Sequence, residues 1–256
     1  MYNQQIRKEV FFMTKNIVIT GGTSGIGLAT AKLLANEQTN VIIIGKNSEN
    51  NRAVQVANPN LHVYTADLGR LNDIKQVFTK IHKTFNTIDS LFINAGFGLF
   101  KPFTEITEQD FDRSVDLNYK GAFFTAQSAL QYMPNGSNMV FNLSWTHHRG
   151  LATSTLYSST KAATSYLIKS LALELSDRQI RINAVSPGYT NTSQFNEQSI
   201  ETDRLKQMLS DVPEGRFGSA EEIGNVVKFL MSDEASYVNG QEVIVDGGLT
   251  SVQAGV

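Results

Sequence analysis

Glycine is concentrated in the segment Thr20-Gly21-Gly22-Thr23-Ser24-Gly25-Ile26-Gly27, with the spacing G-x3-G-x-G. The segment follows the apolar run 17–20 and leads directly into the amphipathic stretch 26–36. Without side chains the backbone can turn tightly and approach a pyrophosphate, whose charge meets the unpaired N–H groups and positive dipole end of the following helix. A glycine-rich turn can also be a plain connection, but its position between a strand and a helix favours dinucleotide binding.

Apolar runs alternate with amphipathic stretches along the rest of the chain. Strands are predicted at residues 17–20, 41–45, 61–65, 88–94, 138–144, 180–186 and 242–245. Helices are predicted at residues 26–36, 71–85, 108–133, 158–175 and 220–231. Strands that are apolar throughout are buried on both faces, and helical crossovers between them give parallel pairing. The pattern predicts an α/β fold: a single doubly wound Rossmann-type domain with a mostly parallel seven-stranded sheet and helices on both faces.

This domain is expected to span residues 15–256, after an N-terminal extension, 1–14, that we expect to be poorly ordered. Segment 188–218 lacks strong periodicity and is rich in Asn, Gln, Ser and Thr. Ligands of doubly wound sheets bind outside the carboxyl ends of the strands, and this segment follows such an end. It is therefore a candidate mobile cover over the substrate.

The composition excludes several classes of protein. A chain of 256 residues that is 41% hydrophobic can bury a core without disulfides or a structural metal. Its formal net charge of −2 argues against a nucleic-acid partner, and its lack of cysteine removes thiol nucleophiles and thiolate metal ligands. We expect no metal. No apolar run approaches the roughly 20 residues that cross a bilayer, and no secretory signal is recognised, so we expect a cytoplasmic protein without a membrane partner.

Polar residues follow the second, third and fourth predicted strands, where the ligand crevice is expected. Lys46 stands where an acidic residue would hold the ribose 2′-OH of NAD, and a cation there suits the 2′-phosphate of NADP. NADP(H) is therefore favoured over NAD(H), although Lys46 could also be a solvated strand-end lysine. Asp67-Leu68 could contact the adenine. Asn94-Ala95-Gly96 could contact the cofactor, or Asn94 could equally hold the strand ends together.

Ser144 ends the fifth predicted strand, and Tyr157 and Lys161 lie near the start of the next helix. Four residues apart, Tyr157 and Lys161 share one helix face. An ammonium close to the phenol is expected to lower the phenol pKa and make Tyr157 a usable proton donor and acceptor. Ser144 could then bond the substrate oxygen. A Tyr-x3-Lys pair alone is common, and its value here comes from following a dinucleotide turn.

Several neighbouring residues invite other interpretations. His147 and His148 lie near Ser144, but no Ser-His-Asp order or metal-ligand spacing accompanies them, so they are interpreted as loop residues. Trp145 is interpreted as a pocket wall or a packing residue. The aromatic residues at 97, 100 and 103 follow a strand end and could line a substrate pocket, although phenylalanines more often belong to a core.

Together these residues resemble the short-chain dehydrogenases/reductases of the compact, single-domain type, over residues 15 to about 250. The matching motifs are, in order, Thr20 to Gly27, Asp67, Asn94-Ala95-Gly96, Asn118, Ser144, Tyr157-x3-Lys161, Pro187-Gly188 with Thr192, and Val245-Asp246-Gly247-Gly248. Ser24 departs from the family, because many NADP-dependent relatives carry a basic residue there.

The resemblance implies a catalytic tetrad of Asn118, Ser144, Tyr157 and Lys161. Lys161 would also bind the nicotinamide ribose, Asn118 would hold a water linked to Lys161, and Thr192 would meet the nicotinamide carboxamide. The full set of expected cofactor-binding residues is Gly21, Thr23, Ser24, Gly25, Ile26, Gly27, Lys46, Asp67, Leu68, Asn94, Ala95, Gly96, Tyr157, Lys161, Pro187, Gly188, Thr190 and Thr192.

The sequence thus predicts an NAD(P)-dependent oxidoreductase that transfers a hydride between nicotinamide C4 and a carbonyl or secondary-alcohol carbon of a small molecule. The alternative is a catalytically silent dinucleotide-binding protein on the same fold. The resemblance also implies a homo-oligomer, a tetramer or dimer, built by pairing of the helical regions 105–131 and 158–175.

Overall fold

The computed structural model describes residues 14–252 and is centred on a seven-stranded parallel sheet with the strand order β3-β2-β1-β4-β5-β6-β9. Its strands are β1 Lys15–Thr20, β2 Thr39–Gly45, β3 Leu61–Thr65, β4 Ser90–Ile93, β5 Asn138–Asn142, β6 Arg181–Pro187 and β9 Glu242–Val245. The order runs outward in both directions from β1 and β4, as helical crossovers on both sides require. The predicted doubly wound α/β class is confirmed.

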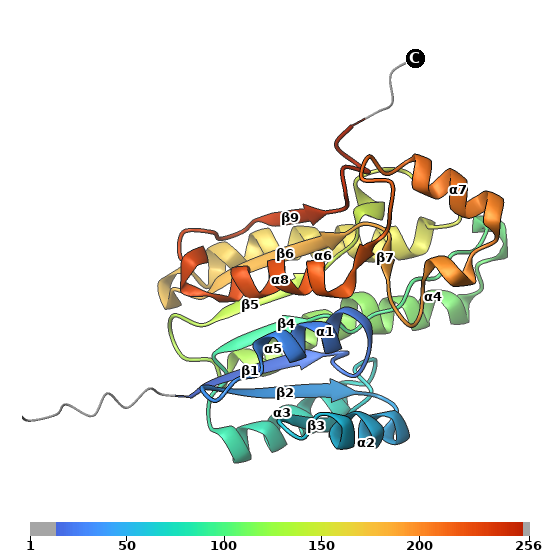
Figure 1. The fold of residues 1–256 in the computed structure, drawn as a ribbon. Helices are drawn as coiled ribbons and strands as arrows, with labels where there is room; N and C mark the ends of the chain where they lie inside the picture. The colour runs from blue at the N-terminus through green and yellow to red at the C-terminus, as the bar shows by residue number, and fades with distance from the viewer. Residues whose placement is uncertain (1–13, 253–256) are drawn as a thin grey trace, which may run out of the picture.

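The apolar strands bury side chains on both faces of the sheet. Val18 and Ile42 belong to one hydrophobic core, whereas Ile19 and Ile43, one residue further along each strand, belong to the other. This alternation follows from the two-residue period of a strand. Figure 1 shows α1 and α8 on the near face of the sheet and α3, α5 and α6 behind it.

The helices are α1 Gly25–Leu34, α2 Ser48–Ala57, α3 Leu71–Phe85, α4 Glu108–Val115, α5 Ala122–Leu130, α6 Thr155–Glu174, α7 Thr202–Ser210 and α8 Ala220–Met231. The sequence interpretation omitted α2 and α7. Each buries very little, Asn51 and Val54 in α2 and Met208 in α7. The apolar residues of α7, Leu205, Met208 and Leu209, do stand at helical spacing, but they extend over less than two turns and lie within the polar segment 188–218. Apart from the long helix predicted at 108–133, the predicted helices and strands are present, with ends displaced by a few residues.

The long helix predicted at 108–133 is wrong as a continuous α-helix. A π-helical segment, Asp116–Gly121, separates α4 from α5. Such wide turns are frequent at functional sites. This one contains Asn118, whose side chain is buried.

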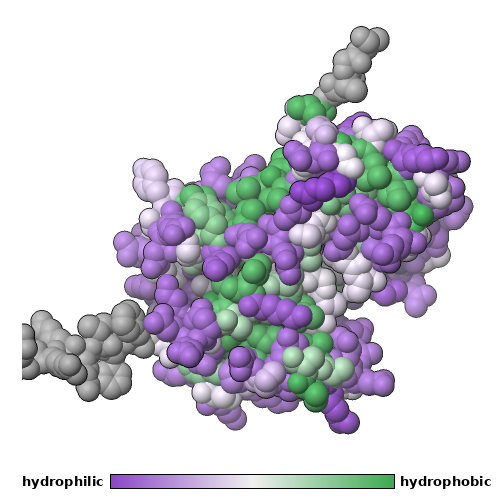
Figure 2. All heavy atoms as spheres, in the orientation of Figure 1, coloured by the Kyte–Doolittle hydropathy of each residue, from purple (hydrophilic) through white to green (hydrophobic). Residues whose placement is uncertain are grey.

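The carboxyl ends of the strands all point to one side of the molecule, and α4 and α7 lie beyond them (Figure 1). Segment 188–218 contains α7 and the short strands β7 Thr190–Asn191 and β8 Gly218–Ser219, which pair with each other. Figure 2 shows a mainly hydrophilic face with apolar side chains gathered beside α7. The predicted N-terminal extension lies outside the described residues except for residue 14.

Candidate active site

The glycine-rich turn connects β1 to α1 and has no room for side chains at its narrowest point. Gly21 has a φ of 61°, in the left-handed region that favours glycine. A Cβ on Gly27 would lie 2.3 Å from the carbonyl oxygen of Gly21 and 2.7 Å from Nδ2 of Asn94. The turn therefore needs glycine at both positions, because the first turn of α1 packs directly on the backbone that leaves β1.

The N-terminus of α1 faces the segment that follows β6. The helix begins after Ser24, whose side chain makes no capping hydrogen bond within residues 14–252. A Cβ on Gly25 would lie 3.3 Å from Cβ of Thr192. The predicted pyrophosphate turn and the predicted carboxamide contact thus lie side by side, and α1 offers N–H groups there without a competing side-chain cap.

Asn94 joins the ends of three strands. Its Nδ2 donates to the carbonyl oxygens of Thr20 at 3.0 Å and Gly21 at 3.2 Å, and its Oδ1 accepts from Nδ2 of Asn142 at 2.9 Å. These bonds link β1, β4 and β5. The sequence left two roles open for Asn94, contact with the cofactor or holding the strand ends together. These bonds support the second role.

Lys46 and Asp67, at the ends of β2 and β3, form an ion pair with Nζ and Oδ2 2.9 Å apart. The Lys46 side chain is 75% exposed, so its head can still meet a ligand from solvent. The other oxygen of Asp67 accepts the N–H of Gly69 at 3.1 Å. Although burial opposes it, the hydrogen bonds from Lys46 and Gly69 leave the pKa of Asp67 below its usual value.

Lys161 is buried on α6 and connects the predicted catalytic residues to the strand ends. Its Nζ donates to the carbonyl oxygen of Asn142 at 2.7 Å and lies 5.6 Å from the centre of the Tyr157 ring. Burial lowers the Lys161 pKa to about 8. Ser144 precedes a short turn and accepts from the N–H of Thr146 at 3.3 Å and its hydroxyl at 3.1 Å.

The expected lowering of the Tyr157 pKa is wrong for this structure. Burial raises the pKa of the phenol, and a hydrogen bond with Ser144 opposes that effect only in part. The ammonium of Lys161 is directed at a backbone carbonyl, so its proximity does not outweigh the loss of hydration. Without ligand, Tyr157 is therefore a protonated phenol at neutral pH.

Asn118 is fixed by the loop that follows β4. Its Oδ1 accepts the N–H of Phe97 and its Nδ2 donates to the carbonyl oxygen of Phe97, both at 3.0 Å. A Cβ on Gly96 would lie 3.0 Å from Asn118 Oδ1 and 3.6 Å from Lys161 Nζ. The π-helical segment thus brings Asn118 close to Lys161 across a position without a side chain.

Aromatic side chains lie near the predicted catalytic residues. The ring of Phe100 is 5.8 Å from that of Tyr157 and is half exposed. Trp145, which follows Ser144 directly, packs against Tyr189 at 5.2 Å and belongs to a small apolar cluster with Val212, which follows α7. The walls near Tyr157 are therefore largely apolar.

The remaining predicted cofactor residues lie along the same edge of the sheet. Gly188 follows β6 and donates its N–H to the carbonyl oxygen of Val245 at 2.9 Å; a Cβ there would lie 2.6 Å from Cα of Asp246. Thr190 bonds back to the carbonyl oxygen of Gly188 at 3.1 Å. The residues that lie at or just after strand ends are Leu68, Ala95, Gly96 and Pro187, while Thr23 and Ile26 lie within the glycine-rich turn.

A cluster missed by the sequence interpretation joins the turn after Ser144 to β9. His147 and His148 both contact the carboxylate of Glu242, and their ligand-type atoms lie within 4.8 Å of one another. In the described part of the chain this is the grouping of three His or acidic side chains that could hold a metal ion. Glu242 lies 95 residues beyond His147, so no local spacing could reveal the cluster.

None of the helices within residues 14–252 combines the length and apolar character needed to cross a membrane.

Comparison with known proteins assigns the family. A family model described as enoyl-(acyl carrier protein) reductase matches residues 21–250. A 3-oxoacyl-[acyl-carrier-protein] reductase of Thermotoga maritima is 37% identical over 92% of this chain and 97% of its own. Glucose 1-dehydrogenase of Gluconobacter oxydans is 30% identical over 93% of both chains.

Solved structures agree with the sequence relatives. Levodione reductase superposes with a TM-score of 0.87 at 32% identity, covering 94% of this chain and all of its own. A short-chain dehydrogenase from Burkholderia cenocepacia in complex with NADP has a TM-score of 0.87 at 26% identity, covering 94% of this chain and 99% of its own. The chain therefore belongs to the short-chain dehydrogenase/reductase family of oxidoreductases.

Proposed function

We propose that the protein transfers a hydride between C4 of a nicotinamide cofactor and a carbonyl or secondary-alcohol carbon, with Tyr157 as general acid and base. One chain of hydrogen bonds carries this proposal. Lys161 Nζ bonds the backbone of Asn142, the Asn142 side chain bonds Asn94, and Asn94 bonds the carbonyl of Gly21. The proton-handling residues and the glycine turn are thus held in one rigid frame.

The residues present fit a dinucleotide. Gly21 and Gly27 leave bare backbone at the turn, and α1 begins there without a side-chain cap among the described residues. Both features suit a pyrophosphate. Thr192 beside Gly25, and Lys161 beyond Gly96, would then hold the nicotinamide half of the same molecule.

The nicotinamide, when bound, supplies or accepts the hydride, and the protein handles orientation and the proton. During reduction the Tyr157 phenol donates its proton to the substrate oxygen, while the Ser144 hydroxyl bonds that oxygen and stabilises its developing charge. Lys161, with a pKa of about 8, is mainly protonated at neutral pH and stabilises the phenolate left behind. Burial raises the pKa of Tyr157, so at neutral pH the phenol carries the proton that carbonyl reduction requires.

The aromatic side chains near the site support one substrate class. Phe100 lies beside Tyr157, and Trp145, next to Ser144 in the chain, packs against Tyr189. An uncharged, partly apolar carbonyl compound suits such walls. Two of the relatives are named as reductases, one of a 3-oxoacyl group on a carrier protein and one of levodione.

The direct test follows cofactor absorbance with a panel of ketones and alcohols. An oxidoreductase consumes one NAD(P)H for each carbonyl reduced. Cofactor binding, seen by fluorescence, without turnover on any substrate would instead support a silent dinucleotide-binding protein. That outcome would reject the proposed reaction while leaving the family assignment intact.

NADP(H) is proposed as the preferred cofactor because Lys46 follows β2 and no acidic side chain occupies positions 45–48. Lys46→Ala is expected to lower kcat/KM for NADPH by about tenfold, as the loss of one charge-assisted hydrogen bond of roughly 1.5 kcal/mol would. Values for NADH are expected to change little. Lys15→Ala is the matched control, because Lys15 is an exposed lysine with an ion pair to Asp233 at the opposite ends of the strands. Equal losses with both cofactors would contradict the assignment.

A homo-oligomer is proposed from the exposed face of α6. Tyr166 and Leu173 lie two turns apart on this helix and are 72% and 77% exposed. We expect Tyr166→Glu with Leu173→Glu to reduce the molar mass measured by light scattering, because charges would enter an apolar contact. Val56→Glu, at an exposed valine of α2, is the control. An unchanged mass in the double variant would place the interface elsewhere.

A cytoplasmic location is also proposed, and cell fractionation tests it.

A further inference from the structure

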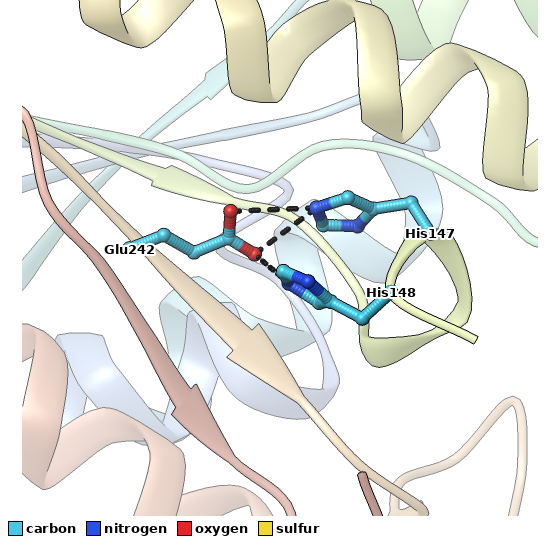
Figure 3. Close-up of side chains that lie close together, drawn as sticks. All are labelled: His147, His148 and Glu242. Atoms are coloured by element: carbon cyan, nitrogen blue, oxygen red, sulfur yellow. Dashed lines mark hydrogen bonds and ion pairs between the residues drawn. The ribbon is translucent and has the colours of Figure 1, made fainter. Parts of the chain in front are cut away.

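The carboxylate of Glu242 lies at the centre of a polar cluster beneath the turn that follows Ser144. Figure 3 shows His147 and His148 pointing from this turn toward Glu242 on β9. Nε2 of His147 lies 3.1 Å from Oε1 and 3.3 Å from Oε2, and Nε2 of His148 lies 2.6 Å from Oε1. The Glu242 side chain is only 16% exposed.

Two hydroxyl groups complete the surroundings of this carboxylate. Ser165 Oγ of α6 donates to Oε2 at 2.9 Å, and Ser186 Oγ of β6 donates to Oε1. Although burial opposes it, the hydrogen bonds from His147, Ser186 and His148 lower the Glu242 pKa to about 2, so the group is charged at neutral pH. An ionised carboxylate accepts hydrogen bonds only, and all four neighbours can donate.

The elements joined by Glu242 carry the catalytic residues. Tyr157, Lys161 and Ser165 occupy successive turns of one face of α6, so the bond to Ser165 fixes the helix that presents the first two. The imidazoles fix the turn that begins at Ser144. One carboxylate therefore sets the position of Ser144 relative to α6.

The state of His147 favours hydrogen bonds over a metal ion at this cluster. A metal bound at Nε2 would require the proton of the neutral imidazole to reside on Nδ1, and metal-bound histidines almost always donate that second N–H. His147 Nδ1 is buried and has no hydrogen-bond partner within residues 14–252. The Nε2–H form leaves Nδ1 without a proton and lets Nε2 donate to Glu242. The 2.6 Å separation at His148 is also shorter than the roughly 3.3 Å between neighbouring ligands of a tetrahedral zinc ion with bonds near 2.0 Å.

We propose that Glu242 is a positioning residue. It acts through His147, His148 and Ser165 to hold Ser144 at a fixed position relative to Tyr157. The contacts of its carboxylate are with side chains of the protein. The kinetic part of this inference rests on the proposed function. Small displacements of a catalytic group are costly, so Glu242→Gln is expected to lower kcat by about 10- to 100-fold. The KM for the cofactor is expected to stay near the wild-type value.

A double-mutant cycle separates positioning from general loss of structure. If Glu242 acts through Ser144, Glu242→Gln has little further effect once Ser144→Ala has been made. Equal fold-losses in both backgrounds would overturn the proposal. Asp110→Asn is the matched control, because Asp110 is another hydrogen-bonded carboxylate with a pKa of about 2, located in the cap of α4. It should give the same fold-change with and without Ser144.

A spectroscopic measurement tests whether Glu242 anchors the turn that begins at Ser144, and it does not require activity. Trp145 is the single tryptophan of the chain, lies in the anchored turn and is buried. Glu242→Gln is expected to red-shift its emission while far-UV circular dichroism is retained, and Ser165→Ala, which removes one bond only, should shift it less. Unchanged emission in both variants would overturn the anchor. If wild type lacks turnover, the proposed function fails but this measurement still decides the anchor.

Titration with Zn²⁺ tests the alternative that His147, His148 and Glu242 form a metal site. We expect no stoichiometric binding by calorimetry and no rise in the thermal midpoint. One Zn²⁺ bound per chain, lost in Glu242→Gln, would replace the hydrogen-bonded anchor with a metal site.

Discussion

Tyr157→Phe is expected to lower kcat by roughly 10³-fold, the middle of the range for loss of a general acid or base. The substitution removes one hydroxyl and retains the ring, including its contact with Phe100. The loss is expected because the phenol hydroxyl is the group proposed to give its proton to the substrate oxygen, while the nearby Lys161 Nζ donates to the Asn142 carbonyl. Stopped-flow or steady-state absorbance of the cofactor measures the loss.

Cofactor affinity should remain close to the wild-type value in Tyr157→Phe, because the glycine turn and Lys161 are untouched. Fluorescence titration with NADPH measures this affinity. Tyr237→Phe is the control, since Tyr237 is fully exposed. Activity retained in Tyr157→Phe would remove the proposed acid and base, whereas loss of cofactor binding together with kcat would assign the hydroxyl a binding role instead.

Local patterns in the sequence were sufficient to predict the fold class, and they point to candidate site residues that the structure brings to one edge of the sheet. The glycine spacing describes a turn within eight residues, and Tyr157 and Lys161 are one helical turn apart, so both signals lie within a short window. The buried strands are apolar throughout because both faces pack against helices. Each of these features depends on neighbours in the chain.

The features that escaped prediction depend on distant contacts. Glu242 meets His147 across 95 residues, and Asn118 meets Phe97 across 21, where the helix widens to a π turn. The pKa of Tyr157 was expected to fall because the sequence indicates the nearby ammonium but not the burial of the phenol. Burial is a property of the whole fold, and here it outweighs the charge.

Gly27→Ala is expected to weaken both the fold and cofactor binding. Its Cβ would lie 2.3 Å from the Gly21 oxygen and 2.9 Å from the Gly21 carbonyl carbon, which are backbone atoms that cannot rotate away. Overpacking of this kind costs about 1–3 kcal/mol, or more where backbone must move. For a chain of this size, about 2–4 °C is lost per kcal/mol, so the thermal midpoint should fall by roughly 2–12 °C.

The same displacement separates the start of α1 from the turn, so the N–H groups proposed to meet the pyrophosphate lose their alignment. We expect NADPH affinity to fall by at least about tenfold, equivalent to roughly 1.4 kcal/mol. Gly150→Ala is the control, because a Cβ there would meet no atom within 4 Å. A Gly27→Ala protein with the wild-type midpoint and affinity would show that α1 can shift freely against β1. The turn would then not be the rigid cradle that the proposed function requires.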